Sequence, residues 1–242
     1  MADHEDERGS PKDDVSQHGD GRLSRREIVT VGLAAVGAGL SPSAAAAATE
    51  KAATAVGTGA SGTTATEFRA RFEQSGPTGE HFIAYGYVTN AQGLSEDDLF
   101  DGTPLSDTTA LLTAYAEGEL VRRTVDQSVH SLDIEGTLTV YQRASPGATF
   151  ADAGSFQVGT PVAQFAITLQ DIVTVFAPAK GLPTLTGDMR QTAASHLEGT
   201  GLRKKFGSVG AESRLFATGL GTLLNPATFN SFLEMAGHWT MK

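Results

Sequence analysis

Hydrophobic and polar residues alternate along most of the chain after residue 66, with the period of a β-strand. Over 68–73 apolar side chains alternate with charged ones, and over 132–143 a longer run of apolar side chains alternates with charged and uncharged polar ones. A period of two places one row of side chains on a buried face and the other in water. Similar signals recur in seven further segments: 81–90, 108–116, 119–129, 161–177, 185–197, 211–223 and 229–241.

Short turn signals rich in Gly and Pro separate most of these segments, for example at 75–77, 145–147 and 180–183. Consecutive long strands joined by short turns favour an up-and-down arrangement, and closure of such a sheet removes its exposed edges. We therefore predict a mainly β fold: a single antiparallel β-barrel of about eight or nine strands. A β-sandwich is the alternative.

A few segments depart from simple alternation. Residues 172–177 are apolar on both faces, which predicts a strand that is covered on both sides. Ser95 followed by Asp98 resembles a capping box, so we expect one helical turn over 96–100. Residues 225–228 predict a second short helical turn because a proline follows an asparagine.

The first 48 residues have a different pattern and resemble a twin-arginine signal peptide. An acidic segment is followed by Arg25-Arg26, then by an apolar stretch over 28–40 and an alanine run. Charged, apolar and small-residue regions in this order are typical of signal peptides, and the paired arginines are typical of the twin-arginine class. The resemblance implies recognition of Arg25 and Arg26 by the twin-arginine translocase, cleavage by signal peptidase near residues 46–48, and folding before export.

The expected organisation is a signal peptide (1–48), a flexible linker (49–65) and the barrel domain (66–242). The linker is assigned because Ala, Gly, Thr and Ser dominate it. The apolar stretch of the signal is too short to anchor the chain in a bilayer. The chain has no cysteine, which excludes a lipoprotein anchor, disulfides and thiolate metal sites. We therefore expect a secreted or cell-envelope protein whose core alone stabilises it.

Charge and motifs narrow the function further. The formal net charge of −10 argues against nucleic acid and anionic membranes as partners, because both need basic patches. The sequence lacks the nucleophile elbow, the zinc-protease motif, the phosphate-binding loop and the dinucleotide fingerprint. The acidic run over 96–102 lacks the alternating spacing that a calcium loop needs. We therefore expect no cofactor and no metal.

The leading hypothesis is an exported, non-catalytic barrel that binds a small apolar ligand or a partner. Gln164 and Gln170 alternate with apolar residues of one predicted strand, so they are the candidates for a polar face of the lumen. Trp239, the single tryptophan, shares a strand face with other apolar residues and is expected in the core. At the level of the fold alone, such a barrel is similar to the lipocalins, which carry apolar ligands.

Two alternatives remain open. A cofactor-free isomerase or cyclase would resemble allene oxide cyclase and dirigent proteins, again at the level of the fold alone. It needs a shaped cavity and a few polar groups that stabilise developing charge. The candidate catalytic residues are Tyr85, Glu135, Tyr141 and Arg214. The other alternative is a secreted structural or envelope-associated protein that assembles as a homo-oligomer through its strand surfaces.

Overall fold

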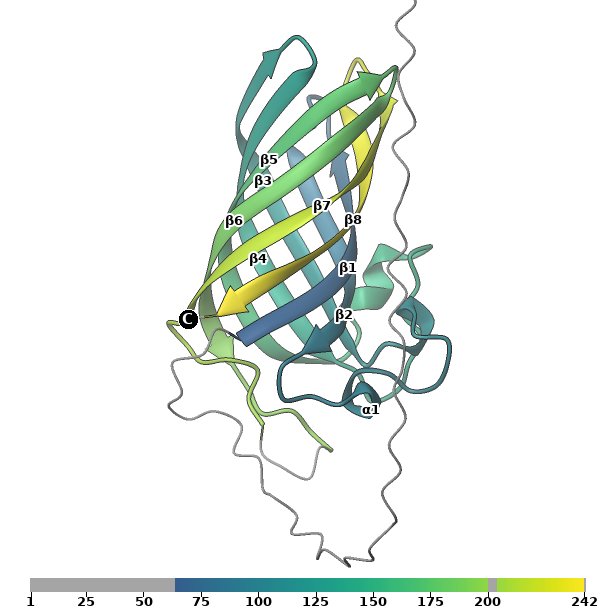
Figure 1. Cartoon of the computed structure of the whole chain (residues 1–242), viewed down its shortest axis with the longest axis vertical. Coiled ribbons are helices and arrows are strands. Elements are labelled where there is room, and N and C mark those ends of the chain that lie inside the picture. The colour runs from purple at the N-terminus through teal and green to yellow at the C-terminus, as the bar shows by residue number, and fades with distance from the viewer. Residues whose placement is uncertain (1–63, 200–203, 242) are drawn as a thin grey trace, which may run out of the picture. The chain divides into compact units, whose positions relative to one another are not determined.

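The structure, a computed structural model, describes residues 64–199 and 204–241, and within them eight strands form a closed barrel (Figure 1). Each strand is antiparallel to its neighbours in chain order, and the last strand pairs with the first. The antiparallel barrel is therefore confirmed over the sandwich. The strands are β1 (Thr64–Ser75), β2 (His81–Ala91), β3 (Leu112–Asp126), β4 (Val129–Gln142), β5 (Thr160–Ala177), β6 (Lys180–Ala194), β7 (Glu212–Asn225) and β8 (Asn230–Met241).

The two ends of the barrel differ. Short turns join β1 to β2, β3 to β4, β5 to β6 and β7 to β8 at one end, which lies at the top of Figure 1 and is called the hairpin end here. Longer connections leave the other end. They carry the short helices α1 (Glu96–Leu99), η1 (Asp107–Thr109) and η2 (Ala153–Gln157).

Of the two helical turns expected from the sequence, one is present. The capping box is present, with the backbone N–H of Ser95 donating to Asp98 Oδ2 at 2.8 Å, and α1 begins directly after it. The second expected helical turn is wrong: residues 226–229 form the hairpin turn between β7 and β8. Asn225 instead accepts the backbone N–H of Ala227 at 3.0 Å, which holds the turn without a helix. The expected strands 108–116 and 119–129 are parts of one strand, β3.

The core lies inside the barrel because each strand directs its apolar row inward. On β5 the inward row includes Phe165, Ile167 and Leu169, all less than 9 % exposed. Trp239 on β8 is 2 % exposed, which confirms its place in the core. Burying each large apolar side chain of this kind stabilises the fold by about 1.5–3 kcal/mol.

A second apolar layer lies outside the barrel, against β2. The outward-facing Tyr85 and Tyr87 are buried beneath Phe150 and Phe156 of the connection between β4 and β5. The ring centroids of Tyr85 and Phe156 are 5.3 Å apart. Within the described part of the chain no such cover lies on the outer face of β5 at this end, so the expectation for 172–177 is wrong: Ile172 is 40 % and Phe176 57 % exposed.

Inward-facing glycines let neighbouring strands approach closely. At Gly219 on β7, an added Cβ would overlap the backbone carbonyl oxygen of Glu234 on β8. Backbone carbonyls in a ladder cannot yield as a flexible side chain would, so any larger residue at this position must push two paired strands apart. The tight coiling of the sheet here depends on the missing side chain.

We predict that Gly219→Ala lowers the free energy of unfolding by about 2 kcal/mol or more, because the methyl group has no space in the ladder. Gly154→Ala, at an exposed position of η2, is the control, since its added Cβ would come no closer than 3.3 Å to a side-chain oxygen of Asp152. Urea denaturation of both variants measures the difference. Equal losses in the two variants would contradict the close approach.

Candidate ligand-binding cavity

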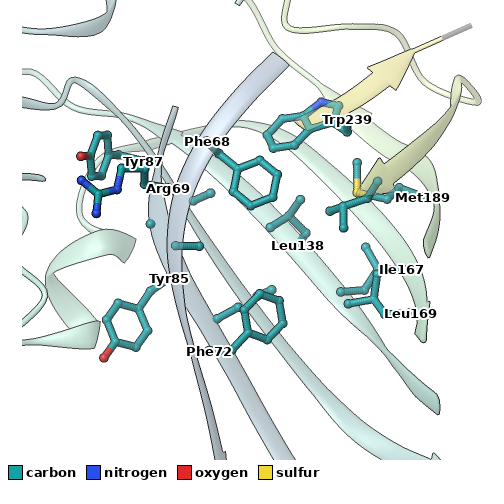
Figure 2. Close-up of a pocket in the computed structure, with 16 residues that line it drawn as sticks. Phe68, Arg69, Phe72, Tyr85, Tyr87, Leu138, Ile167, Leu169, Met189 and Trp239 are labelled. Atoms are coloured by element: carbon teal, nitrogen blue, oxygen red, sulfur yellow. The ribbon is translucent and has the colours of Figure 1, made fainter. Parts of the chain in front are cut away.

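The barrel interior holds an apolar cavity of about 50 Å³ (Figure 2). Large side chains bound it on one side, among them Phe68, Phe72 and Trp239. Beside β1, the next two strands β2 and β3 direct only glycine or alanine into the cavity, such as Ala84, which pairs with Phe72, and Ala116. The pairing of small residues with large ones leaves the space open, because the small side chains do not reach the centre of the barrel.

The size of this cavity limits what enters it without rearrangement. An engineered apolar cavity of about 150 Å³ holds benzene, and a cavity needs only about 10–15 Å³ to hold one water. The interior as it stands therefore takes a molecule of a few heavy atoms. A larger guest requires movement of a lining side chain such as Phe72 or Leu138.

A second, smaller cavity of about 20 Å³ lies nearer the hairpin end. Phe72 lines both cavities and stands between them. Three polar side chains contribute to the smaller one: Asp171 from β5, Gln74 from β1 and Ser231 from β8. Among the described residues the interior is thus apolar around the main cavity, except for the unpartnered Nε1 of Trp239, and polar toward both ends. Asp171 and Gln74 are buried near the hairpin end, and Thr66, Gln191 and Ser213 are buried near the other end.

Asp171 is the one charged side chain that is buried among the described residues, with 2 % of its surface exposed. Burial raises its pKa from the usual value near 4 to about 7, and a hydrogen bond from the backbone of Thr184 offsets part of this effect. Its Oδ1 atom has no hydrogen-bond partner within the part of the chain that the structure describes. The carboxyl group is therefore neutral below about pH 7 and free to donate its proton.

The other two polar groups are already partnered. Gln74 donates through Nε2 to the carbonyl oxygen of Gly79 at 2.6 Å, and Ser231 donates to Gln74 Oε1 at 3.2 Å. These bonds tie β8 and the β1–β2 turn together across the hairpin end. They leave Asp171 as the group with an unused hydrogen-bonding atom.

Arg123 on β3 closes the hairpin end above this cavity. Its guanidinium donates to the carbonyl oxygens of Thr78 at 2.7 Å and Gly79 at 3.0 Å, and it lies 4.3 Å from the ring centroid of Phe229. Burial lowers the pKa of Arg123, and burial together with Arg123 lowers the pKa of His130 on β4. Basic and acidic groups therefore both lie at this rim, because Glu80 is close enough to act on Arg123, and the cavity beneath it contains a further acid.

The four candidate catalytic residues lie on the outside of the barrel. Tyr85 points away from the cavity (Figure 2), donates to Glu73 and has its pKa raised to about 12, mainly by burial. Glu135 and Tyr141 lie on the outer face of β4. Arg214 is exposed on β7 and pairs with Asp188 at 2.9 Å. The structure does not bring the four into one site.

Gln164 and Gln170 also face outward, and both are exposed on β5. Gln170 donates to Asp133 on the outer face of β4 at 3.3 Å. The physical reason is that the lumen of this barrel takes the apolar row of every strand, so the polar row of β5 lies in water. A polar lumen would require the reverse arrangement.

Asp171 escaped the sequence analysis although the sequence contains its signal. It follows Phe165, Ile167 and Leu169 at a spacing of two, on the row that alternation assigns to the core. An acid in register with apolar residues of one strand face is costly unless it has a use or a partner. The residues that follow it, 172–177, are apolar on both strand faces, so alternation alone does not show there which face is buried.

Among the described residues, no group of three or more His, Asp or Glu side chains is placed to hold a metal ion. None of the helices in this part of the chain is long and apolar enough to cross a membrane. The signal-peptide segment, with Arg25 and Arg26, lies outside the described residues.

We predict that Asp171 makes stability fall as pH rises. Between about pH 4 and pH 7 the folded protein keeps a proton that the unfolded chain releases, so each step upward in pH favours unfolding. Asp171→Asn has no such group to ionise. Its free energy of unfolding, relative to that of the wild type, should therefore rise by about 2–4 kcal/mol when the pH is raised from 4 to 8. Urea denaturation at both values measures it, with Asp188→Asn as the exposed control. Parallel pH profiles for wild type and Asp171→Asn would disprove it.

Comparisons of the chain with family models, with curated proteins and with solved structures find no match.

Proposed function

We propose that this protein is exported in the folded state and that its barrel binds a small, mainly apolar molecule in the interior cavity. The observation that carries the proposal is the apolar cavity itself, enclosed by a continuous ladder of eight strands. An eight-stranded barrel has an interior just wide enough to be filled by side chains or to hold one small ligand. The alanines and glycine that β2 and β3 direct inward leave this interior incompletely filled, which favours a barrel that holds one small ligand.

The rigidity of the wall supports binding rather than collapse. Every strand pairs on both sides, so the wall cannot close over the empty space without breaking ladder hydrogen bonds. Engineered apolar cavities of this kind stay dry and accept apolar guests. The absence of any acidic or basic side chain from the inner wall around this cavity, within the described residues, favours an uncharged guest.

Binding is measurable through Trp239, because the chain has a single tryptophan and it lines the cavity. We expect a saturating small alkene of a few carbons, such as propene, to change the emission of Trp239 and to raise the melting temperature of the wild type. Ala116→Leu fills the cavity and should weaken binding by about tenfold or more, while Ala166→Leu on the exposed outer face of β5 should not. An unchanged emission and melting temperature at saturation would refute binding in the interior.

The export part of the proposal rests on the order of charged, apolar and small residues over 1–48. Recognition by the twin-arginine translocase requires the arginine pair, so replacing Arg25 and Arg26 by Lys should leave the precursor in the cytoplasm. Arg22→Lys, three residues before the pair, keeps the same charge and should be exported normally. Fractionation and immunoblotting of cells expressing each variant separate the outcomes. Equal export of both variants would exclude the twin-arginine route.

A further inference from the structure

The smaller cavity suggests which chemical group the ligand carries. We propose that Asp171, in the cavity that it shares with Gln74 and Ser231, receives the carbonyl oxygen of a small ketone-like or aldehyde-like ligand whose apolar part occupies the main cavity. This inference rests on the proposed binding function and specifies it. Asp171 donates the hydrogen bond, and the ligand oxygen accepts it.

The first argument is the energetic misfit of Asp171 in the free protein. A carboxyl group buried in an apolar interior loses the hydrogen bonds of water, and its neighbours return only part of them. Thr184 supplies one backbone N–H, while Oδ1 stays without a partner in the described structure. Buried polar atoms are nearly always paired, so an unpaired one that lines a cavity indicates a partner that occupies that cavity.

The second argument is the match between the cavities and a molecule with an apolar body and one polar atom. The cavity beside Asp171 measures about 20 Å³, which is room for one group the size of a water molecule. Leu169, two residues before Asp171 on the same strand face, lines the main cavity. Phe72 lines both cavities, so the ligand needs the Phe72 ring to rotate away from the boundary between them.

The third argument concerns charge and selects a neutral ligand. The groups that face Asp171 from the packed strands are Phe72 and Gln74 of β1, Phe82 of β2, Leu132 of β4, and Ser231 and Leu233 of β8. None of these is titratable. Arg123 and His130 lie at the rim of the same end, and the guanidinium of Arg123 is already held by two turn carbonyls.

Without a cation in contact, the carboxyl group is stable as the neutral acid, because burial favours the uncharged form. A neutral carboxyl group is a hydrogen-bond donor, and a carbonyl oxygen is an acceptor only. A ligand amine would instead need the ionised carboxylate. The two ligand classes therefore have opposite pH dependences.

The test uses two probes of the same shape, butanone and 2-methyl-1-butene, in which a methylene group replaces the carbonyl oxygen. Both are titrated into the full chain at pH 5.5 and pH 8.5 and followed by Trp239 emission. We expect butanone to bind the wild type about 10- to 30-fold more weakly at pH 8.5, because Asp171 has then lost its proton. The affinity for the alkene should change little with pH.

Three variants test whether the hydrogen-bond donor of Asp171 causes the pH dependence of butanone binding. Asp171→Asn keeps a donor that does not titrate, so it should bind butanone with the same affinity at both pH values. Asp171→Leu removes the donor and should bind butanone no more tightly than the alkene. Asp188→Asn, on the exposed outer face of β6, should retain the pH dependence of the wild type.

The outcomes distinguish this proposal from the one on which it rests. Equal affinities of the wild type for butanone and the alkene, with no pH dependence, would overturn the role of Asp171 and leave apolar binding intact. Binding of butylamine that strengthens toward pH 8.5 and is lost in Asp171→Asn would also overturn it, in favour of an amine. Failure of both neutral probes to bind at any pH would remove the interior site altogether.

Discussion

The pairing of β8 with β1 is the contact on which the rest of this structure depends. It joins the two ends of the described chain through a ladder that runs from Thr64 opposite Met241 to Gln74 opposite Ser231. Once these strands pair, the sheet has no free edge, and each strand has one face toward a common interior. The inside and the outside of the molecule are then defined for every alternating residue.

Closure also explains why the interior is neither solid nor open. Eight strands enclose a space that large side chains fill, as Phe68 and Trp239 do on one side. The neighbouring strands β2 and β3 direct alanine and glycine inward, and the large side chains of β2, Tyr85 and Tyr87, pack on the outside beneath the long connections. The large side chains of β2 thus pack against the long connections and not inside the barrel, and the space that they leave inside is the cavity.

Asp171 acquires its significance from the same closure. On an open sheet the carboxyl group would face water and behave as an ordinary aspartate. Inside the barrel it lies among Phe72, Phe82 and Leu132, which raises its pKa and leaves one oxygen without a partner in the described part of the chain. Stability is given up at this position, and a ligand that supplies the missing partner would recover it.

The sequence by itself determined most of the strands, their alternation and the burial of Trp239, because these follow from the local period of apolar residues and from short turns. It favoured a barrel, but the choice over a sandwich was decided by the pairing of β8 with β1. Only the tertiary structure decided which faces were covered. Ile172 and Phe176 were expected to be buried and are exposed, because the connections pack on β2 instead. Tyr85 was expected in a site and lies under η2, while Asp171 passed unnoticed in an apolar row. Alternation assigns a residue to one face of its strand. What packs against that face is decided by strands and loops distant in sequence, because these come together only when the barrel closes.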